Sequence, residues 1–228
     1  MFPDSNPIEK PRMSCPPHES CPHCQKAEGL CVCAAIDPID TKTTVVILQH
    51  PQEQAESLGT GWLTHCQLRN SVLRVGLSWP SLRRLLEQEV DMKRWGVLYL
   101  GSAKDTPRPE ENPLLVLSRS GERLASAASI LRSLDGIILL DGTWSQAKAL
   151  WWRNPWLLKA HRLVLNPPSR SRYGKLRREP RRESLAVIEA AAFALARLDH
   201  RPDLEALILK PFDLLVDKLK AIPAQKNG

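Results

Sequence analysis

Short apolar runs alternate with amphipathic or polar segments along most of this chain. The runs are rich in Val, Ile and Leu and are too short for buried helices, so they predict strands. The predicted strands are Thr43–Gln49, Val72–Leu77, Gly96–Leu100, Leu114–Leu117, Gly136–Leu140 and His161–Leu165. Helical spacing predicts helices over Glu56–Leu68, Leu82–Val90, Ser126–Leu134, Trp144–Trp152 and Ser184–Leu198, and a last helix that Asp203 caps and Pro211 kinks or breaks. Strands that alternate with helices favour an α/β fold with a mostly parallel sheet flanked by helices.

The stretch Gly136–Leu150 joins an apolar run to a polar turn and the start of a helix. A continuous apolar run is typical of a strand buried on both faces. Ligands of α/β proteins bind beyond the carboxyl ends of such strands, where this chain has Asp141 and the permissive Gly142. The alternative interpretation is an ordinary turn in which Asp141 or Thr143 caps the helix. His50 follows the first predicted strand in the same way, and it too is either a turn residue or a functional one.

Four cysteines follow one another in the pattern C-x2-C-x6-C-x-C, at Cys21, Cys24, Cys31 and Cys33. The N-terminus lacks a basic segment followed by an apolar one, so no signal peptide is expected and the thiols should stay reduced. Four thiolates at this spacing favour a tetrahedral Zn²⁺ ion, which would order a segment with little apolar content. Cys15, His18 or His23 could replace one ligand, and a redox pair or unbound thiols are the alternative to a metal. Cys66 stands alone on a predicted helix and is expected to be a small buried hydrophobe.

The formal net charge is +7, and most of it lies in Ser169–Arg182, which holds seven basic side chains and one acidic one. A concentrated positive loop favours a polyanionic partner, most simply nucleic acid. A solvated basic loop is the alternative.

No apolar run approaches the roughly 18 residues that a membrane-spanning helix needs, so no membrane contact is expected. With the missing signal peptide, this predicts a cytoplasmic protein.

The segment Asp141-Gly142-Thr143-Trp144 resembles the D-x-T-W signature of the DTW-domain family, whose members are tRNA-uridine aminocarboxypropyltransferases. Three further segments agree in the same order along the chain. The four cysteines match the family's N-terminal pattern, and Gln49–Glu53 is similar to its His-Pro-x-Glu segment. Leu176–Ala190 is similar to a basic segment that leads into a Leu-x-x-x-Glu-Ala helix. The resemblance covers residue 21 to about residue 195.

The chain departs from the family at two places. The family has Ser-Thr where this chain has Ala186-Val187, so no side-chain hydrogen bond is expected there. Leu100 stands where the family has proline, before the Gly101-Ser102 loop. Neither change affects Asp141 or His50.

The resemblance implies a fold related to the SPOUT class, an α/β sheet with a C-terminal knot. It implies S-adenosylmethionine as the donor and 5′-methylthioadenosine as the by-product. The 3-amino-3-carboxypropyl group would pass to N3 of a uridine in tRNA, the expected partner. The predicted domains are a flexible tail at 1–14, which is rich in Pro and polar residues, a zinc-binding element at 15–40 and a catalytic domain at 41–225. Monomer and homodimer both remain open.

The resemblance also implies a set of site residues, with Asp141 and His50 as the catalytic ones. Asp141 would either accept the N3 proton, aided by partial desolvation, or bind the amino or sulfonium group of the donor. The expected donor contacts are Gly101, Ser102, Leu140, Asp141, Gly142, Thr143, Trp144 and Leu185. The expected RNA contacts are Glu53, Arg172, Tyr173, Lys175, Arg177 and Arg178, with Tyr173 stacking on an exposed base. His50 and Glu53 are expected to line one pocket that holds the target base or the donor.

Three other functions are alternatives to this one. An RNA methyltransferase that uses the same donor would release S-adenosylhomocysteine instead of 5′-methylthioadenosine. A non-enzymatic, zinc-stabilised RNA-binding module would explain the cysteines and the basic segment, but it would not bind the donor. A weaker alternative is aminocarboxypropyl transfer to ribosomal RNA.

Overall fold

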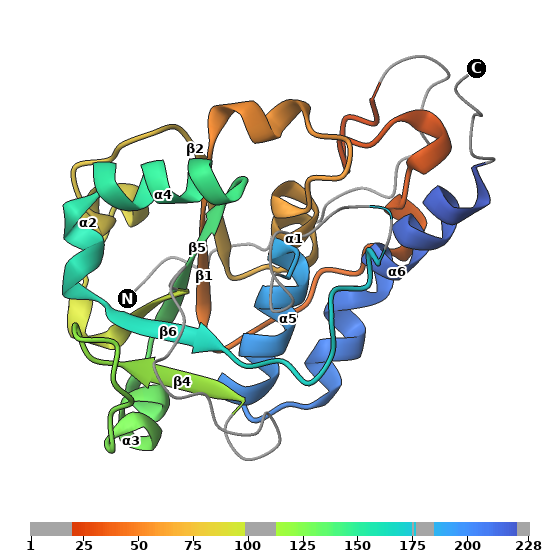
Figure 1. Ribbon diagram of the computed structural model, residues 1–228. Helices are drawn as coiled ribbons and strands as arrows, with labels where there is room; N and C mark the ends of the chain where they lie inside the picture. The colour runs from red at the N-terminus through yellow and green to blue at the C-terminus, as the bar shows by residue number, and fades with distance from the viewer. Residues whose placement is uncertain (1–19, 99–112, 175, 177–184, 223–228) are drawn as a thin grey trace, which may run out of the picture.

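The computed structural model describes residues 20–98, 113–174, 176 and 185–222 of the chain. In this part of the chain, six strands form one sheet in the order β2-β1-β5-β3-β6-β4 (Figure 1). The strands are β1 (Thr44–Gln49), β2 (Ser71–Val75), β3 (Trp95–Leu98), β4 (Leu114–Leu117), β5 (Gly136–Asp141) and β6 (His161–Leu165). All neighbouring strands are parallel except at one edge, where β4 and β6 are antiparallel. This arrangement confirms the predicted α/β class with a mostly parallel sheet.

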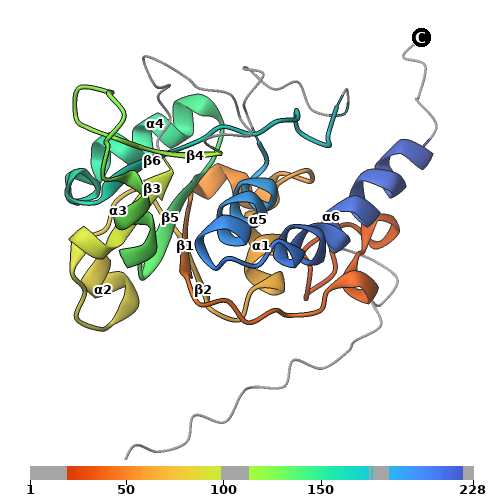
Figure 2. The same cartoon turned by 90° about the horizontal axis from the view of Figure 1, so that it is seen from below.

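Helices cover both faces of the sheet. The α-helices are α1 (Gly61–Gln67), α2 (Leu82–Leu86), α3 (Ala127–Ser133), α4 (Trp144–Arg153), α5 (Val187–Leu198) and α6 (Asp203–Ala221). Short 3₁₀ turns are η1 (Glu28–Leu30), η2 (Cys33–Ala35), η3 (Pro51–Ala55), η4 (Met92–Arg94) and η5 (Pro155–Lys159). Helices α1, α5 and α6 lie on one face, and α2 and α4 on the other (Figure 2).

Alternate residues of the central strands belong to two different cores. In β1, Val45 and Ile47 pack with α1, α5 and α6, whereas Val46 and Leu48 pack with α2 and α4. Because both faces are buried, the strand is a continuous apolar run and not an alternating one. Polar side chains therefore appear only at its two ends, Thr44 at the start and Gln49 at the carboxyl end, where the parallel strands β1 and β5 end together.

Helices α1 and α2 are shorter than predicted. Helix α1 begins at Gly61 and not at Glu56, because the intervening residues form a turn whose carbonyls accept hydrogen bonds from distant side chains. Helix α2 ends at Leu86 and not at Val90, because Glu87 adopts the left-handed conformation (φ 56°) that terminates helices.

The last helix differs from the prediction at its start and does not break at Pro211. Asp203 does not cap α6: it is the first helical residue and forms an ion pair with Arg201 at 2.6 Å. Nor does Pro211 break the helix, which runs unbroken to Ala221. A proline removes the hydrogen bond to the carbonyl four residues earlier. That carbonyl, of Leu207, accepts a hydrogen bond from Gln67 Nε2 at 3.0 Å instead.

The cysteine-rich segment is continuous with the main core. Cys21, Cys24 and Val32 are buried in the same apolar cluster as α1, α5 and α6. The tail predicted at 1–14 lies outside the described residues. Among the helices that the structure describes, none combines the length and the apolar character required to cross a bilayer.

Candidate functional site

Asp141 lies at the carboxyl end of β5, directly opposite Gln49 at the end of β1. Its side chain is buried, with 4% of the residue exposed. Gln49 Nε2 donates a hydrogen bond to Asp141 Oδ2 at 2.7 Å, and the main-chain N–H of His50 donates to the Asp141 carbonyl at 2.9 Å. The carboxylate is therefore held in place from the neighbouring strand.

Helix α1 begins immediately against this carboxylate. A Cβ atom at Gly61, the first residue of α1, would lie 2.0 Å from Asp141 Oδ2 and 3.0 Å from Gln49 Nε2. Any side chain at this position would displace the carboxylate, so glycine is required for the close approach. Gln49 and Gly61 were not among the site residues predicted from sequence. The signal for Gln49 is a polar residue ending an apolar strand, as Asp141 does.

The turn after β5 is a capped helix start. Thr143 is the N-cap of α4: its Oγ1 accepts from the Gln146 N–H at 3.4 Å, and Gln146 Oε1 accepts from the Thr143 N–H at 2.6 Å. The capping alternative is thus right for Thr143, whereas the Asp141 carboxylate is bonded to Gln49. Gln146 Nε2 also donates to Gln52 Oε1 at 3.0 Å, which links α4 to η3.

The 3₁₀ turn η3 forms the next part of this sheet edge. His50 is half-exposed and caps η3, its Nδ1 accepting from the Gln52 N–H at 3.3 Å. Glu53 in the same turn is buried, with 3% of the residue exposed. Among the described residues, neither of its carboxylate oxygens has a hydrogen-bond partner. Asp141, His50 and Glu53, predicted from three motif positions, therefore belong to segments that meet at one edge of the sheet.

The start of α5 reaches the same edge. The Ile188 N–H donates to Thr60 Oγ1 at 3.3 Å, and Thr60 directly precedes Gly61. The buried Glu189 carboxylate accepts from the Ala186 N–H at 2.8 Å, and from Ser171 Oγ and the Arg172 N–H at 2.7 Å each. These bonds tie the beginning of the basic segment to the helix. Half-buried Leu185 precedes this junction.

The expectation that Tyr173 stacks on RNA is wrong for this structure. The Tyr173 ring is 1% exposed and packs edge-on against Phe212 of α6, with the ring centroids 4.9 Å apart. Its hydroxyl donates to the Leu58 carbonyl. Arg172 is partly exposed and forms an ion pair with Asp213 at 2.5 Å. Other predicted contacts lie outside the described residues, namely Gly101, Ser102, Lys175, Arg177 and Arg178.

The predicted cysteine cluster is brought together by the fold. The Sγ atoms of Cys21, Cys24, Cys31 and Cys33 all lie within 4.8 Å of one another. Four sulfurs around a tetrahedral Zn²⁺ ion would be separated by about 3.8 Å, so the donor set fits this metal. His23 Nδ1 lies 3.4 Å from Cys33 Sγ, and Cys15 and His18 lie outside the described residues.

Burial raises the pKa of the Cys24 and Cys33 thiols, because desolvation disfavours their thiolates. A metal cation supplies the charge that stabilises thiolates in such surroundings. Thiolates in this cluster would therefore need a bound cation to stabilise them.

The cysteine-rich segment also holds the loop between η3 and α1. Buried Lys26 donates from Nζ to the carbonyls of Ser57 (2.8 Å) and Gly59 (2.5 Å). The His23 carbonyl accepts from Trp62 Nε1 at 2.8 Å and from Cys66 Sγ at 3.3 Å. The prediction that Cys66 is buried is confirmed. Through these bonds, the cysteine cluster is connected to the segment that carries Glu53 and Gly61.

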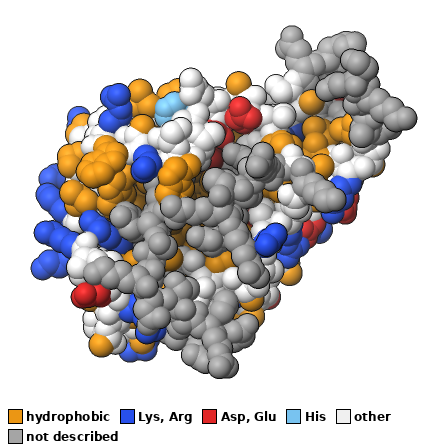
Figure 3. Space-filling model, in the orientation of Figure 1, with side chains coloured by type: hydrophobic (Ala, Val, Ile, Leu, Met, Phe, Trp, Pro, Cys, Tyr) orange, Lys and Arg blue, Asp and Glu red, His pale blue; other side chains and the backbone are white. Residues whose placement is uncertain are grey.

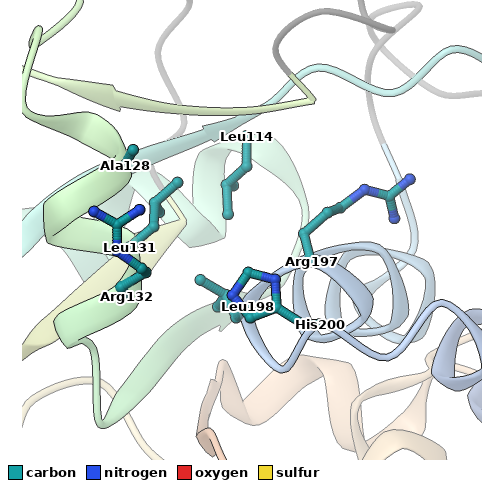
Figure 4. A pocket seen from close by; sticks show the side chains of 7 residues that line it. All are labelled: Leu114, Ala128, Leu131, Arg132, Arg197, Leu198 and His200. Atoms are coloured by element: carbon teal, nitrogen blue, oxygen red, sulfur yellow. The ribbon is translucent and has the colours of Figure 1, made fainter.

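A cavity of about 180 Å³ lies elsewhere, between α3 and the end of α5 (Figure 4). Its walls are mainly apolar, with the basic side chains of Arg132, Arg197 and His200 around them. Arg197 is already engaged, because it donates to the Phe193 carbonyl and to Glu205. None of the residues around Asp141 lines this cavity. The candidate site lies instead at the carboxyl edge of β1 and β5, where Gln49 and Gly61 hold the buried Asp141 carboxylate.

Basic side chains are visible beyond the predicted basic segment. On the face drawn in Figure 3, Lys and Arg side chains gather along the left edge, on the side where Figure 1 draws α2. Arg83 and Arg84 of α2 are exposed. Positive charge is therefore also present on the described surface of the chain.

Comparison with known proteins gives a consistent result. The family model of the DTW domain matches residues 18–220. A Drosophila melanogaster protein named tRNA-uridine aminocarboxypropyltransferase 2 is 28% identical over 201 residues, which are 86% of this chain and 72% of that protein. Proteins of the same name from Mus musculus and Macaca fascicularis are 26% identical over 200 and 198 residues, covering 86% of this chain and 61% of theirs. The chain thus spans less than two thirds of the two mammalian relatives. No solved structure gives a significant match.

Proposed function

This chain belongs to the DTW domain family, and on that basis we propose that it is a tRNA-uridine aminocarboxypropyltransferase. It transfers the 3-amino-3-carboxypropyl group of S-adenosylmethionine to N3 of a tRNA uridine and releases 5′-methylthioadenosine. The observation that supports this most is the buried Asp141 carboxylate at the carboxyl edge of the sheet, held by Gln49 and closely approached by Gly61. This is the edge where α/β folds bind their ligands.

Asp141 acts as the general base in this proposal. N3 of uridine carries a proton and is a poor nucleophile until the proton leaves. The hydrogen bond from Gln49 fixes the orientation of the carboxylate, so it can accept that proton without first rearranging. His50, the residue after Gln49, also holds this edge, because its main-chain N–H donates to the Asp141 carbonyl.

The reaction is selected by positioning. Three carbons adjoin the sulfonium of the donor, and the one that faces N3 is attacked. Main-chain groups at Leu140, Gly142 and Leu185, with Thr143 and Trp144, surround the edge at which the donor binds in this proposal. Gly101 and Ser102 are proposed to contact its adenosine. These residues place the γ-carbon of the amino-acid chain toward the uridine.

The cysteine cluster holds a structural Zn²⁺ ion in this proposal. Four sulfurs close the coordination shell and leave no position for a water or a substrate, so the ion supplies order and not catalysis. Arg172, Lys175, Arg177 and Arg178 contact the tRNA backbone. We further propose the SPOUT-related topology with a C-terminal knot and the cytoplasmic location that the resemblance implies.

The proposed reaction is tested by mass spectrometry. The purified chain, incubated with S-adenosylmethionine and unmodified tRNA, should produce 3-(3-amino-3-carboxypropyl)uridine and an equal amount of 5′-methylthioadenosine. Release of S-adenosylhomocysteine with a methylated nucleoside would instead establish a methyltransferase. Modification of ribosomal RNA but not of tRNA would change the substrate class.

Replacing Gly61 with alanine should impair the site while leaving the fold intact. The new Cβ would lie 2.0 Å from Asp141 Oδ2, so the carboxylate must move. We expect transfer to fall at least tenfold, and the free energy of unfolding to decrease by about 1–3 kcal/mol, as for other overpacked positions. Single-turnover kinetics and urea unfolding measure the two effects.

Gly29 provides the control, because a Cβ there would meet nothing within 4 Å. The Gly29→Ala variant should transfer the group as fast as the unchanged chain. Equal activity of Gly61→Ala would mean that the carboxylate position is not critical.

A further inference from the structure

Glu53 differs from the other buried carboxylates described above. Asp141 accepts a hydrogen bond from Gln49, and Glu189 accepts three from the residues that it clamps. Glu53 is equally buried, yet its Oε1 and Oε2 both lack a hydrogen-bond partner among the described residues. Buried polar groups in native structures are nearly always paired, so an orphaned carboxylate requires an explanation.

The position of Glu53 is fixed by its main chain. Its N–H donates to the His50 carbonyl at 2.9 Å, and its carbonyl accepts from the Glu56 N–H at 3.2 Å. The turn η3 follows β1 directly (Figure 1), and Gln52 within it is bonded to Gln146 of α4. The side chain is thus presented from an ordered turn at the edge where Asp141 lies.

The missing hydrogen-bond partners of the Glu53 carboxylate indicate which chemical group would bind there. An ionised carboxylate that is buried without a partner is strongly disfavoured, so a ligand that brings positive charge would stabilise it. A fitting ligand also offers at least two hydrogen-bond donors, because neither carboxylate oxygen of Glu53 has a partner among the described residues. A uracil N3–H offers one donor and no charge, and a sulfonium offers charge but no donor. A primary ammonium group has three N–H donors and a full positive charge.

We propose that Glu53 binds the α-ammonium group of the 3-amino-3-carboxypropyl chain of the donor. This inference rests on the proposed function. It assigns Glu53 to the group that is transferred, and not to the RNA contact expected from the sequence. Holding the amino-acid chain by its ammonium group turns its γ-carbon, and not the methyl group, toward the nucleophile. Asp141 then does not bind the donor's ammonium group and can accept the N3 proton of the uridine.

Two ligands that differ only in the amino-acid chain test the assignment. S-adenosylmethionine carries the ammonium group, whereas 5′-methylthioadenosine retains the adenosine and the methylated sulfur without it. Calorimetric titration of both into the full chain and into the Glu53→Gln variant gives four affinities. We expect the substitution to weaken S-adenosylmethionine binding about 10- to 100-fold, the effect of one charge-assisted hydrogen-bond site, and to change 5′-methylthioadenosine binding less than about twofold.

The stability of the ligand-free variant is a second readout. Glu53→Gln replaces a buried carboxyl group that lacks a hydrogen-bond partner among the described residues by an amide of the same shape, so its melting temperature should equal or exceed that of the unchanged chain. Glu56→Gln is the matched control, because Glu56 is an exposed carboxylate close by in the same segment. It should leave both affinities unchanged.

Several results would overturn the assignment. Equal weakening of both ligands would place Glu53 on the ribose hydroxyls, and weaker tRNA binding alone would make it an RNA contact. If Glu53→Gln does not fold, the unchanged chain is titrated with a donor analogue that lacks the α-amino group, and undiminished affinity would refute the ammonium contact. An unchanged chain that binds neither ligand would refute the proposed function itself.

Discussion

The Asp141→Asn variant should bind S-adenosylmethionine and tRNA but transfer the aminocarboxypropyl group at least about 100-fold more slowly, the usual contribution of a general base. Asparagine has nearly the same shape, and its side-chain oxygen can still accept the hydrogen bond from Gln49 Nε2. It cannot accept the proton of uridine N3. Single-turnover transfer from labelled S-adenosylmethionine measures the rate, and calorimetry with the donor alone measures binding.

Asp135 offers a matched control at the opposite end of the same strand. It is half-exposed and paired with Arg94, which holds the pKa of the Asp135 carboxyl below its usual range by hydrogen bonding. Asp135→Asn should therefore lose only a surface ion pair and keep full activity. If Asp141→Asn loses donor binding together with transfer, Asp141 is an anchor for the donor and not the base. Full activity would remove it from any essential role.

The central strands were predictable because burial on both faces leaves a clear pattern. A continuous apolar run gives the correct positions of β1 and β5, and the polar residue after each run marks the edge that faces ligands. The turn at Asp141 could be identified in the same way. The cysteine spacing likewise predicted a cluster that the structure brings together. In each case the determining information is local in the chain.

The partners of these residues could not be predicted, because they depend on register and on long-range packing. Gln49 and Asp141 are 92 positions apart, and only the pairing of β1 with β5 places them opposite each other. Tyr173 illustrates the converse error. A tyrosine among arginines is typical of an RNA contact, but the sequence does not show that α6 returns to provide Phe212 as a packing partner.

Lys26 is a second example of a role that only the fold reveals. A lysine beside a cysteine motif is usually solvated, yet here it is 5% exposed and donates to two carbonyls of the loop between η3 and α1. Because this loop joins Glu53 to Gly61, the cysteine cluster supports the candidate site from outside it. Loss of the proposed metal should therefore have the largest effect on stability.

Purified chain should contain about one zinc per molecule, bound by the four cysteines. The Cys24→Ser substitution should abolish this binding and lower the free energy of unfolding by more than about 3 kcal/mol, as expected when a structural metal is lost. Cys24 is fully buried within the core that α1, α5 and α6 share, so loss of order there extends beyond the ligands. Metal analysis and urea unfolding measure both quantities.

Two variants distinguish the effect of losing zinc from the effect of losing nearby side-chain contacts. Cys66→Ser alters a buried cysteine outside the cluster and keeps a donor for the His23 carbonyl, so zinc content should stay unchanged. Lys26→Met keeps the four cysteines but removes the bonds to Ser57 and Gly59, so it should bind zinc normally and bind S-adenosylmethionine more weakly. If Lys26→Met binds the donor as the unchanged chain does, the cluster does not support the site through this loop. Metal-free protein with full stability and four freely titrating thiols would refute the zinc assignment.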